Sequence, residues 1–153
     1  MMEIILDWRP IEPQTDLTQY QQRVEQILRG LGCAEDSILS ITIVDSSIMS
    51  EINYKYRGKE GPTNVLSFIQ KESGVISYDP NLLGDVVICW DRVVSDAENL
   101  GYSVDEMLTY LLIHGILHIV GFDHDSEHNA QAMETKVSDI FQRFFPDNSE
   151  IVK

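Results

Sequence analysis

The chain contains a nearly uninterrupted apolar segment, residues 107–120, that constrains its fold more than any other part of the sequence. Ser103 precedes this segment and Glu106 follows that serine by three positions, which is the signature of a capping box at a helix start. Gly121 is well placed to end the helix. A helix that is apolar on nearly every face must be surrounded by other elements. We therefore expect a central, buried helix.

Strand-like and helix-like segments alternate through the rest of the sequence. Apolar patterns predict strands at residues 2–8, 37–44, 64–69 and 82–89, and helices over residues 17–31, 46–57, 91–100 and 126–145. Residues 74–81 are rich in turn formers. No repeat or linker interrupts this order, so we expect one domain over residues 1–153. Its fold class is α/β of the α+β layered kind, a small mixed sheet packed with about five helices.

Composition indicates an intracellular, soluble protein. The two cysteines, Cys33 and Cys89, form neither a disulfide framework nor a CxxC pair, which fits a reducing compartment. The apolar run at the N-terminus is too short for a signal peptide. The longest apolar stretch falls short of the roughly 20 residues that a membrane span needs. We expect a cytoplasmic location and no association with a membrane.

The charge balance is acidic, with 25 acidic and 11 basic side chains and a formal net charge of −14. Proteins that bind nucleic acid usually present a basic face, so the balance alone argues against that class. The bases are unevenly placed, however, because Lys55, Arg57, Lys59 and Lys71 fall within 17 residues. On charge alone, a solvated surface cluster is the simpler interpretation of these four residues.

Three histidines lie on or just after the expected central helix. His114 and His118 are four residues apart, so their side chains share one face of the helix. Gly121 lets the chain turn, and His124 follows three residues later. A lone histidine on an apolar helix is more often a core residue with a hydrogen-bond partner. Three at this spacing favour a shared metal ion, because burying three imidazoles without a partner costs free energy.

The ligand set predicts Zn²⁺ and hydrolytic chemistry. Zinc prefers neutral imidazole nitrogens in a tetrahedral shell, although nickel, copper or iron also suit three imidazoles. Three protein ligands leave a fourth position for water, whose pKa falls to about 7 on zinc. His128 is expected at the exposed start of the last helix and outside the ligand set.

The same spacing occurs in metalloproteases of the metzincin type. In those enzymes a glutamate next to the first histidine acts as general base. Here that position is Gly115, which cannot move a proton, and neither Asp123 nor Glu127 sits where the motif requires one. The sequence therefore disfavours peptide hydrolysis, while a zinc metalloprotease-like hydrolase stays open as an alternative.

Three segments of the sequence stand out together: residues 114–124 (HGILHIVGFDH), residues 53–57 (NYKYR) followed by residues 62–68 (PTNVLSF), and residues 83–88 (LGDVVI). In their order and spacing they resemble the YbeY-type ribosomal RNA maturation factors, which are metal-dependent endoribonucleases of bacteria. The histidine segment is the most specific of the three. Asn64, Ile69 and Phe122 depart from the family's usual aspartate, proline and tyrosine. None of these departures removes a metal ligand.

The resemblance implies a Zn²⁺-dependent single-strand endoribonuclease, a hydrolase of phosphodiester bonds. It implies ribosomal RNA as substrate, in ribosomal RNA maturation and ribosome quality control, with ribosomal or ribosome-associated proteins as partners. It gives Arg57 a catalytic role, since a planar guanidinium can hold phosphate and stabilise growing charge. Lys55 and Lys59 are expected to bind the substrate, and His114, His118 and His124 to hold the metal.

Three points stay open. The nucleophile is either a metal-activated water or a 2′-hydroxyl of the RNA. Asp85 can orient a ligand imidazole or act as a structural cap. The non-enzymatic alternative is a ribosome assembly factor whose structural metal is closed by a fourth protein ligand. Asp123, Asp125 and Cys89 are the candidates for that fourth position.

Overall fold

The computed structural model describes residues 2–69 and 81–147 of the chain. The strands are β1 (Glu3–Trp8), β2 (Ile38–Val44), β3 (Val65–Ile69) and β4 (Leu82–Cys89). The helices are α1 (Thr18–Gly30), α2 (Ser46–Arg57), α3 (Trp90–Leu100), α4 (Val104–Ile119) and α5 (Glu127–Phe144). Every predicted helix and strand is present, with small shifts at its ends. Nearly all of the predicted turn-rich segment, residues 74–81, lies outside the described residues.

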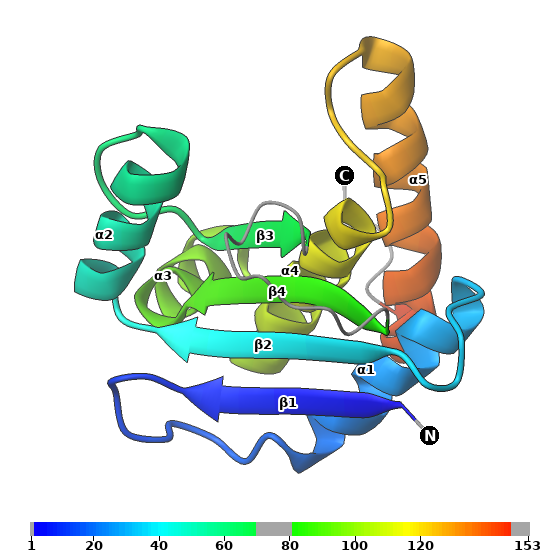
Figure 1. The fold of residues 1–153 in the computed structure, drawn as a ribbon, viewed down its shortest axis with the longest axis horizontal. Helices are drawn as coiled ribbons and strands as arrows, with labels where there is room; N and C mark the ends of the chain where they lie inside the picture. Colours follow the sequence, from blue (N-terminus) through cyan, green and yellow to red (C-terminus); the bar gives the residue numbers. More distant parts are fainter. Residues whose placement is uncertain (1, 70–80, 148–153) are drawn as a thin grey trace.

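The strands form a mixed sheet in the order β1-β2-β4-β3. β1, β2 and β4 are parallel to one another, and β3 runs antiparallel to β4 at the edge. Figure 1 shows α3 and α4 behind β3 and β4, with α5 rising beside them. The predicted fold class, a mixed sheet packed with helices in layers, is confirmed.

Helix α4 is the centre of the fold. It packs against β3 and β4 on one side and against α1, α3 and α5 on the others. The predicted capping box is present, since the Ser103 hydroxyl accepts from the Glu106 amide and the Glu106 carboxylate accepts from the Ser103 amide. None of the helices that the described residues form is both long and apolar enough to cross a bilayer.

One stripe of α4 escapes full burial. Between Glu106 and Ile119 every residue is buried except Tyr110, His114 and His118, which are half-buried. These three recur every fourth residue and so share one helix face. The surroundings of α4 therefore leave open only the face that carries two of the predicted metal ligands.

Helix α2 packs on the opposite face of the sheet. A second apolar cluster forms there from Val44, Met49, Phe68, Val87 and Cys89. The Asp45 carboxylate caps α2 by accepting from the Ile48 amide, and the helix ends at Gly58. Its last turn thereby comes to lie beside β3.

The contact between α4 and the sheet requires a glycine. A Cβ atom at Gly115 would lie 2.7 Å from Cγ1 of Val86 and 3.2 Å from Cγ2 of Val65, which is closer than carbon atoms normally approach. The Gly115 carbonyl accepts a hydrogen bond of 2.8 Å from the Ser67 hydroxyl. The helix is therefore pressed directly onto β3 and β4 at the residue that follows His114.

We expect Gly115→Ala to destabilise the protein by about 1–3 kcal/mol, because the added methyl group overpacks the interface between helix and sheet. Gly30→Ala is the matched control, since a Cβ there meets only the mobile guanidinium end of Arg143 at 3.1 Å. That change should be neutral or stabilising by up to about 1 kcal/mol, as alanine favours helices. Urea unfolding measures both, and a stabilised Gly115→Ala protein would contradict the close packing.

Candidate metal centre

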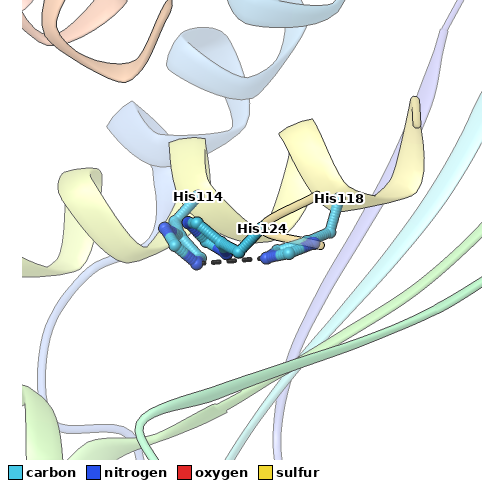
Figure 2. Close-up of side chains that lie close together, drawn as sticks. All are labelled: His114, His118 and His124. Atoms are coloured by element: carbon cyan, nitrogen blue, oxygen red, sulfur yellow. Dashed lines mark hydrogen bonds between the residues drawn. The ribbon is translucent and has the colours of Figure 1, made fainter. Parts of the chain in front are cut away.

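The three predicted ligands converge on one point. His114 and His118 project from the half-buried stripe of α4, and His124 reaches the same point from the segment after it (Figure 2). One ring nitrogen of each residue lies within 4.8 Å of the others. The ring centroids are 4.9 Å apart for His114 and His118, and 5.4 Å for each pair with His124. The chain thus presents three imidazoles to a single position.

The separation of the two Nε2 atoms on α4 fits a metal ion with tetrahedral coordination. Zinc binds imidazole nitrogen at about 2.0–2.1 Å, so two ligands of a tetrahedron stand about 3.3 Å apart. The Nε2 atoms of His114 and His118 are 3.2 Å apart. The residues present therefore fit a zinc-like metal ion, and all three are positioned to bind it.

The loop that carries His124 is fixed at both ends. Gly121 adopts a positive φ of 109°, a backbone conformation that favours glycine, and turns the chain away from α4. After the turn, the Asp123 carboxylate accepts from the Asp125 amide at 3.0 Å and from the Asn129 side chain at 2.9 Å. These bonds hold the loop against the start of α5. His124, although exposed, is placed by them next to the two helix ligands.

The environment keeps the helix imidazoles neutral. Burial lowers the pKa of His114 from 6.5 to about 4, and the neighbouring His118 and His124 add to the effect. Burial also lowers the pKa of His118, again with a contribution from His124. A neutral imidazole has the free lone pair that a metal requires. At pH 7 both helix residues are therefore in the metal-binding form.

No fourth protein donor joins the three histidines within the described part of the chain. The Asp123 carboxylate lines the same cleft but accepts hydrogen bonds from Asp125 and Asn129. Cys89 is buried in the cluster under α2 and lies 3.6 Å from the Ser46 hydroxyl. The group that could hold a metal ion thus consists of three imidazoles, and His128 is not part of it.

The histidines open into a cleft of about 650 Å³. Its two walls come from different parts of the chain. One wall is formed by the end of α2, the following turn and β3, and the other by α4 and the loop after it. The lining residues are Arg57, Lys59, Thr63, Asn64, Val65, Leu66, Ser67, Ile69, His114, His118, Gly121, Phe122, Asp123 and His124.

Arg57 lies on the wall that faces the histidines. Its Nη2 donates to the Ser67 carbonyl at 2.9 Å, and its guanidinium carbon lies 4.8 Å above the ring of Phe68. Phe68 is buried, so the guanidinium rests on a fixed support. Arg57 and the three histidines thus line the same cleft.

The two lysines differ in position. Lys59 lines the cleft with Arg57. The Lys55 ammonium lies 5.1 Å above the ring of Tyr56, outside the residues that form the cleft walls. Asp85 lies in the middle of β4, opposite Phe68 of β3.

Ser67 joins the two halves of the site, and we did not predict it. Its carbonyl accepts from Arg57, while its hydroxyl donates to the carbonyl of Gly115, between the two helix ligands. The signal in the sequence is a serine in a strand that is otherwise apolar. Its partner on α4 depends on how the strand sits against the helix, which local patterns do not give.

Asn64 has a structural partner. Its side-chain amide donates to the Asp96 carboxylate at 3.3 Å. Its backbone carbonyl accepts from the Cys89 backbone amide at 3.0 Å. An aspartate at position 64 would place two carboxylates against each other. The amide therefore suits the neighbouring α3 in this chain, and Asn64 links the cleft wall to that helix.

The sequence is similar to known proteins over most of its length. The profile of the family described as Endoribonuclease YbeY matches residues 7–145. The Endoribonuclease YbeY of Syntrophus aciditrophicus is 39% identical over 128 residues, which cover 82% of this chain and 79% of that protein. The protein of the same name from Bacillus licheniformis is 35% identical over 138 residues, or 86% of this chain and 87% of that one.

A solved structure shares the fold. The solution structure of TM1509 from Thermotoga maritima superposes with a TM-score of 0.58, covering 98% of this chain and 95% of that chain at 24% identity. The family profile and the sequence relatives confirm the resemblance seen in the histidine, arginine and Leu-Gly-Asp segments. This chain belongs to the endoribonuclease YbeY family.

Proposed function

We propose that this protein is a Zn²⁺-dependent endoribonuclease that cuts single-stranded RNA during ribosomal RNA maturation and ribosome quality control. The observation that carries the proposal is the convergence of three imidazoles within 4.8 Å, in one cleft with Arg57. Relatives that cover most of the chain are named endoribonucleases. RNA is therefore the substrate class that the site and the family support together.

His114, His118 and His124 would hold the metal. When bound, zinc supplies a Lewis acid and lowers the pKa of a coordinated water toward 7. Arg57 binds the scissile phosphate from the opposite wall and stabilises the negative charge that grows on its oxygens. Phe68 and the Ser67 carbonyl orient the guanidinium for this task. Lys59 in the cleft and Lys55 in the last turn of α2 bind the neighbouring backbone phosphates.

The packing of Gly115 supports RNA rather than peptide as the substrate. A metzincin-type protease needs a glutamate at this position. Here the position faces β3 and β4, and even one added carbon would lie 2.7 Å from Val86. The place that the general base of a protease would occupy is filled by the sheet.

The donor set supports catalysis rather than a structural metal. A structural zinc site is closed by four protein ligands. In the described residues the group contains three histidines and no carboxylate or thiolate. This chemistry suits an ion with a position left for water or substrate.

The negative net charge of the chain supports a role for a partner that delivers the RNA. A protein with a formal charge of −14 repels bulk RNA over most of its surface. We therefore propose that ribosomal or ribosome-associated proteins in the cytoplasm bring the substrate to the cleft. Weak and strongly salt-dependent binding of isolated RNA is the behaviour that this proposal requires.

Replacing one ligand should remove the metal and the activity together. We expect wild-type protein to bind one zinc ion per chain, and His114→Ala to bind less than a tenth of that at equal free zinc. Elemental analysis after gel filtration measures the content. His128→Ala, outside the donor group, is the matched control and should keep full zinc. Equal zinc in His114→Ala and wild type would rule out this ligand set.

Removing the guanidinium should slow RNA cleavage without removing zinc. We expect Arg57→Ala to lower kcat by about 10²–10³-fold, the size typical for losing one donor to a transition-state oxyanion. Arg57→Lys should restore part of the rate, as lysine keeps the charge but not the planar fork. Arg29→Ala on the distant face of α1 controls for net charge. The same assay identifies the nucleophile, because 2′,3′-cyclic phosphate ends arise only from the 2′-hydroxyl.

The half-buried, neutral His114 should make the metal-free protein less stable in acid. The folded-state pKa of His114 is about 4 against 6.5 for the free side chain, so the unfolded chain binds more protons between these values. Stability from this residue is complete above pH 6.5 and is lost as the pH falls toward 4. We expect the stability difference between wild type and His114→Asn, from urea unfolding with chelator, to shrink over that range. A pH-independent difference would contradict the pKa shift.

A further inference from the structure

We propose that the last turn of α2 is a stacking platform for unpaired RNA bases, formed by Tyr54 and Tyr56 on either side of Arg57. This inference rests on the proposed function and names how the substrate strand is recognised. Single-stranded nucleic acids are commonly held by aromatic rings that stack on bases, next to cations that hold phosphates.

The two tyrosines are unusual in their exposure. Tyr54 is 65% exposed and Tyr56 is 42% exposed. Every other aromatic residue in residues 2–69 and 81–147 is buried or half-buried. The fold thus places large apolar rings in water at one described location, and that location is the end of the helix that carries Arg57.

The rings border the phosphate-binding residue. At about 100° per residue, Arg57 lies about 60° from Tyr54 on one side and about 100° from Tyr56 on the other. The Tyr56 ring meets the Phe68 ring edge to face at 5.3 Å, and the Arg57 guanidinium rests on the same Phe68 ring at 4.8 Å. Tyr56 and Arg57 therefore share one buried support, and a base on Tyr56 would sit beside a phosphate on Arg57.

The basic residues around the two tyrosines favour a nucleic acid as the ligand of this surface. Lys55, Arg57 and Lys59 bring three of the 11 basic residues of this acidic chain into one turn and the residues after it. Glu51 and Glu60 flank the group. Neither Lys55 nor Lys59 has an acidic partner among the residues that the structure describes. Exposed rings beside ammonium groups that lack an acidic partner, one of them 5.1 Å from the Tyr56 ring, fit an anionic, aromatic strand better than an apolar peptide.

The platform should recognise single strands. Bases in a duplex are stacked on one another and their faces are covered, whereas an unpaired base can rotate onto a tyrosine ring. Phosphates alone do not distinguish the two forms in this way. The two tyrosines are therefore the part of the surface that supplies preference for unpaired RNA.

The test is steady-state cleavage of one RNA strand by zinc-loaded protein, without and with a duplex of the same sequence added as competitor. We expect Tyr54→Ala and Tyr56→Ala each to raise KM for the single strand by roughly tenfold with kcat nearly unchanged, as loss of stacking is a loss of uniform binding. The inhibition constant of the duplex should not change. Tyr54→Phe and Tyr56→Phe keep the ring and should retain wild-type KM.

Salt dependence separates stacking from charge. Each phosphate contact to a single strand contributes about 0.7 to the slope of log affinity against log salt. With 1/KM as the measure of affinity, Lys59→Ala should make affinity depend less steeply on salt concentration. The tyrosine changes should leave this salt dependence unaltered. Leu100→Ala, which removes a side chain that is 59% exposed on α3, controls for loss of exposed apolar surface. Because Tyr56 contacts Phe68, a thermal melt accompanies each variant, and Tyr54→Ala carries the test if Tyr56→Ala unfolds.

Several results would overturn the platform while the endoribonuclease function stands. One is wild-type cleavage with KM unchanged in both alanine variants. Another is an equal loss in the phenylalanine variants, which would indicate the hydroxyl groups rather than the rings. A third is an equal rise of the inhibition constant of the duplex. Absence of any RNA cleavage by zinc-loaded wild type would instead refute the proposed function, and the platform with it.

Discussion

Burial of the apolar helix α4 is the constraint on which the rest of the structure depends. The sheet covers one side of this helix, and α1, α3 and α5 cover the others. What remains open is the stripe of Tyr110, His114 and His118. His114 and His118 are therefore placed by the hydrophobic effect, because the surrounding elements bury every other face of this part of α4. Gly115 completes this placement by allowing the helix to touch β3 and β4 directly.

The parts of the site that follow from local rules could be predicted from the sequence. The ligand spacing on α4 depends only on helix geometry, and the turn to His124 depends on Gly121. The helix starts at Asp45 and Ser103 are set by side chains within a few residues. For the same reason the order of strands and helices could be predicted, with only small differences at their ends.

The parts of the site that depend on contacts between distant segments could not be predicted from the sequence. The hydrogen bond from Ser67 to Gly115 joins residues 48 positions apart, and it depends on how β3 packs against α4. The support of Arg57 by Phe68 needs α2 to pack on the same face of the sheet as the Phe68 side chain. The same holds for Asn64 and Asp96, which meet only when α3 packs beside the turn before β3. Periodicity along the chain carries no information about such pairs, because it describes which face is buried and not what buries it.

The central position of α4 also couples the ligand site to the fate of the entire fold. Any ion that the three converging imidazoles hold more tightly in the native state than in the unfolded chain lowers, by mass action, the population of every unfolded form. Since α4 contacts β3, β4 and three helices, none of these elements can detach without disturbing the helix that bears His114 and His118. The free concentration of metal around the protein thus becomes a determinant of its lifetime against unfolding and proteolysis, quite apart from any chemistry in the cleft.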